Sequence, residues 1–231
     1  MKLIDFLFPK VCISCQHPGD YLCLQCKKTL QPHPEICPVS HRFSPDGKVH
    51  IDYRREVAYQ GIAIGFAYSD LLKKLILNLK YYHHYDVAEF FVDRLILIIQ
   101  TNHTLQRLFH TKRVIITSIP SHRYRKYFIK WYNQSELLAR GVAEKLWYQY
   151  IPLVKKRKHT RIQAFLSRRE RMKNLEGVFC LHKDISLQWD ECVLIIDDIT
   201  TTWSTINMLA ETLKRAYPEL TIWGVVIGRH T

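Results

Sequence analysis

The sequence predicts an α/β protein, with a parallel sheet flanked by helices and a small four-cysteine module near its beginning. Two observations predict this class. From residue 58 onward, short apolar runs alternate with segments of helical periodicity, which is the pattern of β-α-β units. Four of the seven cysteines fall within residues 12–26. The chain has 231 residues, 47% of them hydrophobic, which is enough for one such domain and a small appendage.

The cysteine module comes first along the chain. Its spacing, Cys-x2-Cys-x7-Cys-x2-Cys, lets two close pairs bend around one tetrahedral zinc ion, and the Pro-Gly-Asp sequence at 18–20 supplies the turn between them. Free thiols are the alternative, and disulfides are less favoured in a reducing compartment. Because four thiolates leave no open coordination position, we expect a structural zinc held by Cys12, Cys15, Cys23 and Cys26.

A proline-rich segment separates this module from the rest of the chain. Residues 31–50 contain four prolines, few apolar residues and a Pro-Asp-Gly turn signal. This composition is typical of a connector. We therefore expect a zinc-binding module and connector over residues 1–50, and a second domain over residues 51–231.

The second domain is predicted to begin with a strand and two helices. Residues 58–68 alternate in polarity, as a strand or hairpin arm does. Residues 86–100 predict the second, more buried helix. Before it, Ser69 is predicted to cap a first helix, because apolar residues recur after it at helical spacing: Leu72, Leu75, Ile76 and Leu79.

From residue 114 the order becomes β-α-β. Strands are predicted at 114–120, 192–197 and 220–228, and helices at 133–150 and 204–217. The strand at 192–197 begins with a continuous apolar run, which is typical of a central strand in a parallel sheet covered on both faces. Ligands of such sheets bind at the carboxyl ends of the strands, so the residues that end this strand are candidates for a site.

Two carboxylates and a group of hydroxyls stand at that strand end. Asp197 and Asp198 can accept hydrogen bonds from sugar hydroxyls or hold a divalent cation. The start of the next helix offers backbone N–H groups to a phosphate, and further donors come from Thr200, Thr201, Thr202, Ser204 and Thr205. A ribose 5-phosphate satisfies both needs. In the alternative interpretation, the aspartates only end the strand and a hydroxyl caps the helix.

The net charge of +13 is concentrated in two segments. Residues 112–132 carry +6 and no acid, residues 155–173 carry +8, and the remaining residues sum to −1. Segments this basic are typical of phosphate or nucleic-acid surfaces, although a solvated charged face is the alternative. The candidates for nucleic-acid binding are Arg123, Arg125, Lys126, Lys130, Lys155, Lys156, Arg157, Lys158, Arg161, Arg168, Arg169 and Arg171.

Aromatic residues are interleaved with the first basic segment. Cationic grooves bind single strands when aromatic side chains stack on the bases, so this pattern indicates single-stranded DNA as a partner. We expect about half of these aromatic side chains to lie in the core instead. The residues concerned are Tyr124, Tyr127, Phe128, Trp131 and Tyr132.

No secretory or membrane segment is expected. Lys2 and Asp5 interrupt the opening residues, where a signal sequence would need an unbroken apolar stretch. Apolar runs such as residues 95–99 are far shorter than the roughly 20 residues of a membrane-spanning helix. We therefore expect an intracellular protein.

These motifs resemble a known family. The string from Asp197 to Thr205 looks like the phosphoribosyl-pyrophosphate (PRPP) loop of type I phosphoribosyltransferases. More narrowly, the chain resembles the ComF family of competence-associated, phosphoribosyltransferase-like proteins. The likeness includes the four-cysteine module, the helix end Leu79-Lys80-Tyr81, the helix start Asn133-Gln134, and a spaced run formed by Arg157, Thr160, Gln163, Leu166, Arg171, Asn174, Gly177 and Phe179.

The resemblance implies a type I phosphoribosyltransferase-like fold. It implies that Asp197 and Asp198 bind the ribose hydroxyls of PRPP, that residues 200–205 line the phosphate, and that residues 155–173 lie over the site. Mg²⁺ would accompany PRPP and offset its charge. The resemblance also implies a cytoplasmic protein, and a peripheral position at the inner membrane is compatible with it. Such a protein takes part in the uptake of single-stranded DNA during natural transformation, with a helicase as a suggested partner.

Two tryptophans, Trp131 and Trp203, depart from the family pattern, which usually has glycine at both positions. A non-glycine residue in a left-handed conformation costs about 1–2 kcal/mol and adds bulk. We expect PRPP binding to survive if the backbone at Trp203 is right-handed and its indole faces outward. The favoured function is a single-stranded DNA-binding factor in DNA uptake, with PRPP as a ligand. The alternative is an active phosphoribosyltransferase with an unknown acceptor.

Overall fold

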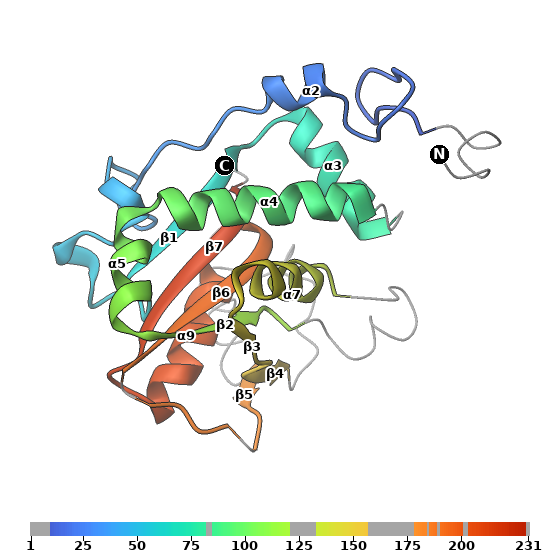
Figure 1. Cartoon of the computed structure of the whole chain (residues 1–231). Helices are drawn as coiled ribbons and strands as arrows, with labels where there is room; N and C mark the ends of the chain where they lie inside the picture. The colour runs from blue at the N-terminus through green and yellow to red at the C-terminus, as the bar shows by residue number, and fades with distance from the viewer. Residues whose placement is uncertain are drawn as a thin grey trace.

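The core of the protein is a five-stranded sheet in which all strand pairs are parallel. The computed structural model describes residues 10–81, 85–120, 133–156, 178–183, 185–188, 190–200 and 203–229. The strand order is β1-β7-β6-β2-β3 (Figure 1). The strands are β1 (Gly61–Ala67), β2 (Arg113–Ser118), β3 (Gln149–Tyr150), β6 (Glu191–Thr200) and β7 (Thr221–Arg229). The predicted α/β class with a parallel sheet is confirmed.

Strand β6 is the central strand. Its ladder with β7 runs from the Cys192↔Thr221 pair to the Thr200↔Arg229 pair, whereas its ladder with β2 ends at Ser118↔Ile196. The predicted strand therefore exists but continues three residues further than expected, because β7 still pairs with it there. As a result, Asp197 and Asp198 lie within the strand, beyond the last residue paired with β2.

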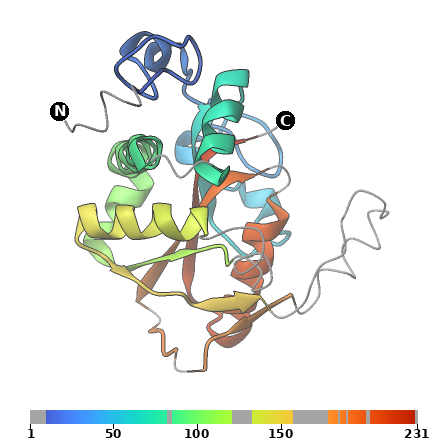
Figure 2. The same cartoon turned by 90° about the vertical axis from the view of Figure 1, so that its right-hand side faces the viewer.

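Helices cover both faces of this sheet (Figure 2). Alternate residues of β6 point to opposite faces, since Leu194 joins one buried cluster and Ile195 the other. The first cluster is covered by α3 (Asp70–Tyr81), α4 (Tyr85–Thr101), α5 (His103–Thr111) and α7 (Gln134–Leu146). The second is covered by α9 (Ser204–Ala216) and by the antiparallel pair β4 (Val154–Lys156) and β5 (Phe179–Leu181). None of the helices in the described ranges has the length and apolar character needed to span a membrane.

The predicted helices form, with one difference in length. Ser69 caps α3 as expected, because its hydroxyl accepts a hydrogen bond from the backbone N–H of Leu72 at 3.2 Å. The helix expected over residues 133–150 instead ends at Leu146. Trp147 adopts a left-handed conformation with φ 61°, and the chain turns directly into β3, which pairs with β2. Sheet pairing thus ends α7 earlier than its periodicity indicates.

The N-terminal segment packs on the same core. Its one regular helix within the described residues is α2 (Leu24–Thr29), and Leu22 and Leu30 on either side belong to the cluster that α3 and α4 cover. The connector then follows the outer edge of β1, where the backbone N–H of Ala67 donates to Gln31 and that of Val49 donates to Gln60. Two short 3-10 turns follow, η1 (Pro45–Gly47) and η2 (Ile51–Tyr53), so the Pro-Asp-Gly turn is confirmed. The domain boundary at residue 50 stays a prediction.

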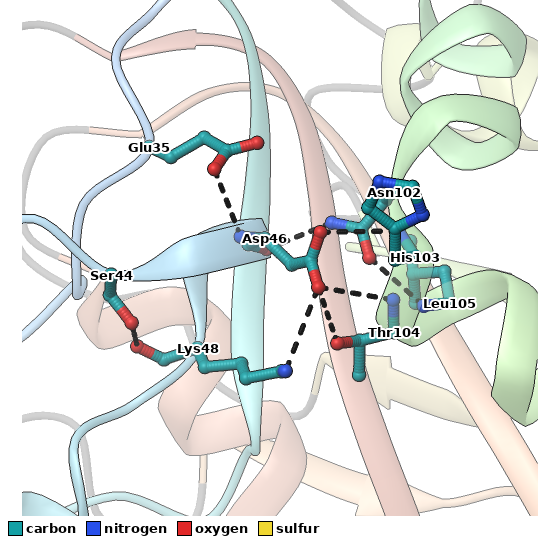
Figure 3. A network of polar contacts seen from close by, with 8 residues as sticks. All are labelled: Glu35, Ser44, Asp46, Lys48, Asn102, His103, Thr104 and Leu105. Carbon is teal, nitrogen blue, oxygen red and sulfur yellow. Dashed lines mark hydrogen bonds and ion pairs between the residues drawn. The ribbon is translucent and has the colours of Figure 1, made fainter.

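A buried carboxylate from the connector caps helix α5 (Figure 3). Asp46 accepts hydrogen bonds from the backbone N–H of His103 at 3.1 Å, and from the N–H and hydroxyl of Thr104 at 3.2 and 2.6 Å. Lys48 lies 3.6 Å from the same carboxylate. Burial alone would raise the pKa of Asp46, but these hydrogen bonds and the Lys48 charge lower it below its usual value. Asn102 completes the cap by accepting from the N–H of Leu105 and donating to the Asp46 carbonyl.

Replacing Asp46 by asparagine is expected to lower the free energy of unfolding by about 2 kcal/mol at neutral pH, because charged hydrogen bonds at a helix start are lost. The folded pKa of Asp46 is depressed. Its stabilisation is therefore present above the unfolded pKa of about 3.9, and is lost as the pH falls through the lower folded value. Denaturant-induced unfolding of wild type and variant at neutral and acidic pH measures the effect.

The matched control is Asp52→Asn, which removes an exposed carboxylate six residues along the same segment. Its free energy of unfolding should stay within about 0.5 kcal/mol of wild type. Equal stabilities of the Asp46 and Asp52 variants would show that the α5 cap contributes nothing.

Candidate functional site

The carboxylate of Asp197 is held at the carboxyl edge of the sheet by a hydroxyl. Helix α7 begins at this edge, and the Oγ of Ser135 in its first turn donates to Oδ1 of Asp197 at 2.6 Å. The backbone N–H of Asp198 donates to the same oxygen at 3.0 Å. Within the described residues, the second oxygen of Asp197 has no hydrogen bond. That oxygen can accept a further hydrogen bond.

The neighbouring Asp198 is paired with a cation. Lys80, in the last turn of α3, places its Nζ 2.6 Å from Oδ2 of Asp198, and the backbone N–H of Ile199 donates to Oδ1 at 2.8 Å. The Gln134 side chain donates to the Lys80 carbonyl at 3.4 Å, which links the start of α7 to the end of α3. Two helices from the same face of the sheet therefore each provide one polar partner to the acidic pair.

The acidic pair shares an unusual electrostatic environment. Burial and the charge of Asp198 raise the pKa of Asp197 to about 7, although the hydrogen bond from Ser135 opposes the rise. The raised pKa favours the protonated acid, which can donate a hydrogen bond, more than in an exposed aspartate, whose carboxylate only accepts them. Both carboxyl groups have polar partners, so neither is simply packed into an apolar interior.

The hydroxyl-rich segment leads from β6 into α9. Thr200 accepts a hydrogen bond from the backbone N–H of Trp203 at 3.2 Å, and Trp203 is the N-cap residue of α9. Its backbone is left-handed, with φ 55° and ψ −8°, and its side chain is buried. A right-handed backbone with an outward indole was the condition for PRPP binding to survive, and Trp203 does not meet it. The strain of about 1–2 kcal/mol is smaller than the roughly 3–5 kcal/mol that truncating a buried tryptophan typically costs, so burial decides the conformation.

The four N-terminal cysteines form a separate site. Their sulfur atoms all lie within 4.8 Å of one another, and Sγ of Cys15 and Cys23 are 3.6 Å apart. All four are free thiols. The first pair sits in a turn where Gln16 adopts φ 60°, and Gly19, with φ 121°, reverses the chain as the Pro-Gly-Asp sequence predicts. The second pair flanks the start of α2, where Cys23 is the N-cap residue.

The electrostatics of this cluster fit a bound cation. Burial would raise the pKa of Cys12, but backbone N–H groups of Cys15, Cys23 and Ser14 lower it to about 6, which favours the thiolate. Burial and the neighbouring thiols raise the pKa of Cys26 to about 12. Four sulfurs this close cannot all be thiolates without a compensating positive charge. Tetrahedral zinc supplies that charge and accepts four sulfur ligands.

Comparison with known proteins places the chain among DNA-related relatives. No family model matches it. The chain is 26% identical over 224 residues to the DNA utilization protein YhgH of Escherichia coli, covering 90% of this chain and 92% of that protein. The Shigella flexneri protein of the same name matches equally well. Competence protein F of Haemophilus influenzae is 31% identical over 115 residues, or 48% of each chain. These matches support a ComF-family assignment.

The fold brings part of the ComF resemblance to one edge of the sheet, but seven of the eight residues of its spaced run, Arg157 to Gly177, lie outside the described residues. Asp197, Asp198 and Thr200 end β6, and Trp203, Ser204 and Thr205 begin α9. Thr201 and Thr202 lie outside the described residues. Ser135 is not among the site residues predicted from the sequence, and Lys80 is predicted only as part of a motif. Their positions could have indicated the site, because Lys80 lies in the last turn of α3 and Ser135 in the first turn of α7, and both reach the carboxyl edge of the sheet.

Most of the predicted nucleic-acid residues lie outside the described part of the chain. Lys155 and Lys156 lie on β4, and Lys155 is exposed. Trp131 and the aromatic residues near it fall outside the described ranges. So do the other ten cations: Arg123, Arg125, Lys126, Lys130, Arg157, Lys158, Arg161, Arg168, Arg169 and Arg171. Their role stays a prediction.

The four-thiol cluster predicts that the purified protein contains about one zinc ion per chain. Cys15→Ser should lose the metal and lower the melting temperature, because metal binding to such a site stabilises the folded state. Elemental analysis and thermal unfolding with and without a chelator measure both effects. Cys180→Ser is the matched control, since Cys180 lies on β5 outside the cluster. A metal-free wild type whose melting temperature is unchanged by the chelator would rule out this role.

Proposed function

We propose that this ComF-family protein acts in the uptake or use of DNA. In this proposal it binds single-stranded DNA through its basic segments, and binds PRPP or a related ribose phosphate at the carboxyl edge of its sheet. The observation that carries the ligand site is the acidic pair at the end of β6, with the start of α9 beside it. Acidic side chains at this edge suit sugar hydroxyls, and a helix N-terminus suits a phosphate.

The geometry of the acidic pair supports a diol ligand. Ser135 holds Oδ1 of Asp197, and this contact also orients the carboxyl group. The second oxygen, Oδ2, is then available to a ligand hydroxyl. Asp198 is balanced by Lys80, so a ligand approaching it meets a cation as well as a carboxylate. When ribose hydroxyls bind the carboxylate of Asp198, a pyrophosphate oxygen could replace that carboxylate as the partner of Lys80.

The DNA part of the proposal comes from the relatives and the charge. One relative is named a competence protein and the others DNA utilization proteins. The two basic segments carry more than the whole net charge of the chain. Such segments bind polynucleotide phosphates by releasing counterions, without requiring a particular base sequence.

Calorimetry with PRPP and Mg²⁺ tests the ligand site. Wild type is expected to bind, and the double variant Asp197→Asn plus Asp198→Asn should bind at least about tenfold more weakly, because two hydroxyl acceptors lose their charge. Since burial and Asp198 raise the pKa of Asp197 to about 7, wild-type affinity should rise from about pH 6 to about pH 8 as Asp197 ionises. The single variant Asp197→Asn should lack this part of the pH dependence, although ligand phosphate ionisation will affect both proteins.

Undiminished binding by the double variant would remove the acidic pair from the ligand site. The same samples test the alternative function, an active phosphoribosyltransferase. Transfer or hydrolysis releases pyrophosphate, so its production from bound PRPP with candidate acceptors would favour an enzyme. Binding without turnover across those acceptors would favour a ligand-sensing or structural role.

Fluorescence anisotropy with a labelled oligonucleotide tests DNA binding. We expect micromolar or tighter, sequence-tolerant binding at low salt, weakening at least about tenfold between about 50 and 200 mM salt. Replacing Arg123, Arg125, Lys126 and Lys130 by alanine should weaken binding and reduce the salt dependence. The matched control removes four cations from other elements, Lys28, Lys73, Lys74 and Arg215. Equal losses in both variants would indicate only a general charge effect, and salt-independent binding would contradict phosphate contacts.

A further inference from the structure

Trp147 is the most exposed large hydrophobic side chain in the described part of the chain. It directly follows α7, and 94% of its surface lies in solvent. Tryptophan is usually well buried, because it carries one of the largest apolar surfaces of any side chain. An indole that protrudes almost entirely into water makes little contact with the rest of the fold. This side chain therefore contributes little to the stability of the isolated protein.

The backbone of Trp147 makes this exposure more unusual. At the end of α7, the N–H of Trp147 donates to the carbonyl of Glu144 at 3.2 Å, and the N–H of Tyr148 donates to the carbonyl of Ala143 at 2.9 Å. This pattern is a Schellman motif, whose turning residue is left-handed and is usually glycine. Trp147 occupies that position with φ 61° and ψ 33°, which strains its backbone. Unlike Trp203, it gains no burial in return.

Two contacts fix the surroundings of Trp147 at the amino edge of the sheet. The next residue, Tyr148, packs edge-on against Phe109 of α5, with ring centres 5.2 Å apart. Gln149 then begins β3, which is parallel to β2, and its side chain accepts a hydrogen bond at 3.2 Å from Nη2 of Arg113, the first residue of β2. The acidic pair of the candidate ligand site lies toward the carboxyl edge of the same sheet. Trp147 therefore stands at the opposite end of the strands from that site.

The surface on the α5 and β2 side of Trp147 is positively charged. Residues 95–135 contain no aspartate or glutamate. Glu191 lies 3.5 Å from Arg113, but 64% of the Arg113 side chain remains exposed. On the α7 side the charges are mixed, so a polyanion would approach the indole from the α5 and β2 side. Three cations lie between the middle of α5 and the start of β2: Arg107, Lys112 and Arg113.

A single exposed aromatic ring beside cations fits single-stranded nucleic acid better than it fits a protein partner. Protein interfaces are centred on several apolar side chains packed together. Within the residues that the structure describes, no exposed large hydrophobic side chain belongs to α5, α7, β2 or β3 themselves. An unpaired base needs only one aromatic face to stack on, and cations beside that face neutralise its phosphates.

We infer that Trp147 stacks on an unpaired base of single-stranded DNA, while Lys112 and Arg113 contact the neighbouring phosphates. The inference rests on the DNA binding proposed above and specifies where one contact lies. It places this contact at the amino edge of the sheet, so DNA bound there does not compete with a sugar phosphate at the carboxyl edge. It also gives a reason for a strained tryptophan at a position where glycine is usual.

Fluorescence anisotropy with a labelled oligothymidylate tests this contact through two leucine variants. Trp147→Leu keeps an apolar side chain without an aromatic face, and should bind at least about fivefold more weakly than wild type. Trp147→Phe keeps a smaller aromatic face and should lose less. The matched control is Phe43→Leu, which replaces a connector side chain that is 71% exposed, and it should bind as wild type does. Equal losses in the two leucine variants, or no loss in Trp147→Leu, would overturn the inference.

Trp147→Gly separates a lost contact from a damaged fold. Glycine relieves the left-handed strain, so the melting temperature should rise while the affinity for the oligothymidylate falls at least about fivefold. A variant that is more stable yet binds more weakly cannot owe its weaker binding to unfolding. A lower melting temperature would show that the indole supports the fold, and would count against a role reserved for DNA.

Fluorine NMR of the full chain labelled with 5-fluorotryptophan observes the indole directly. The Trp147 resonance is identified by its absence from the Trp147→Phe spectrum. The oligothymidylate should shift this resonance in a saturable manner. An unchanged resonance at saturating DNA would mean that the indole serves a different partner, such as a protein, and would refute the stacking contact.

The outcomes separate this inference from the proposed function. If wild type binds single-stranded DNA and Trp147→Leu binds it equally well, the contact is absent while the proposed DNA binding stands. If wild type binds no single-stranded DNA, the DNA part of the proposal and this inference both fail. The ligand site at the acidic pair is unaffected by either result, because Trp147 lies at the other edge of the sheet.

Discussion

Burial of the central strand β6 on both faces is the constraint on which the structure depends. Its apolar residues fill two clusters on opposite sides of the sheet, and its pairing with both β2 and β7 fixes its position. The same strand carries two carboxylates beyond its pairing with β2, and carboxylates are costly to bury without partners. Helices α3 and α7 therefore end and begin where Lys80 and Ser135 can reach Asp198 and Asp197. The same two helices thus cover the sheet and provide the polar partners of the acidic pair.

The N-terminal segment also provides partners for groups that the sheet would leave unpaired, in this case at the edge strand β1. An exposed edge of a sheet offers unpaired backbone groups, and the connector covers β1 by forming hydrogen bonds along it. Asp46 then fixes the connector to α5, because it accepts hydrogen bonds from the N–H groups that have no partner within the helix. Cys12 and Cys26 share a buried cluster with α3 and α4, so a metal held by the thiols would stabilise contacts with the main core.

Trp203 shows how burial can override a local conformational preference. Its left-handed backbone is a conformation that glycine would adopt with less strain. The indole belongs to the buried cluster that includes Ile206 and Val226, and the guanidinium of Arg229 lies over its ring. Strain maintained by the surrounding structure is common at functional sites, where it positions groups that a relaxed chain would not. The tryptophan thus links the hydroxyl-rich segment to the end of β7.

The sequence by itself determined the alternation of strands and helices, the Ser69 cap and the grouping of the four cysteines, because each depends on residues close together in the chain. Only the tertiary structure decided which partners the acidic pair has, since Ser135 is 62 positions from Asp197. It also decided where α7 ends, through the pairing of β3 with β2, and which conformation Trp203 adopts. These features depend on burial and hydrogen bonding between distant segments, and local periodicity carries no information about such contacts.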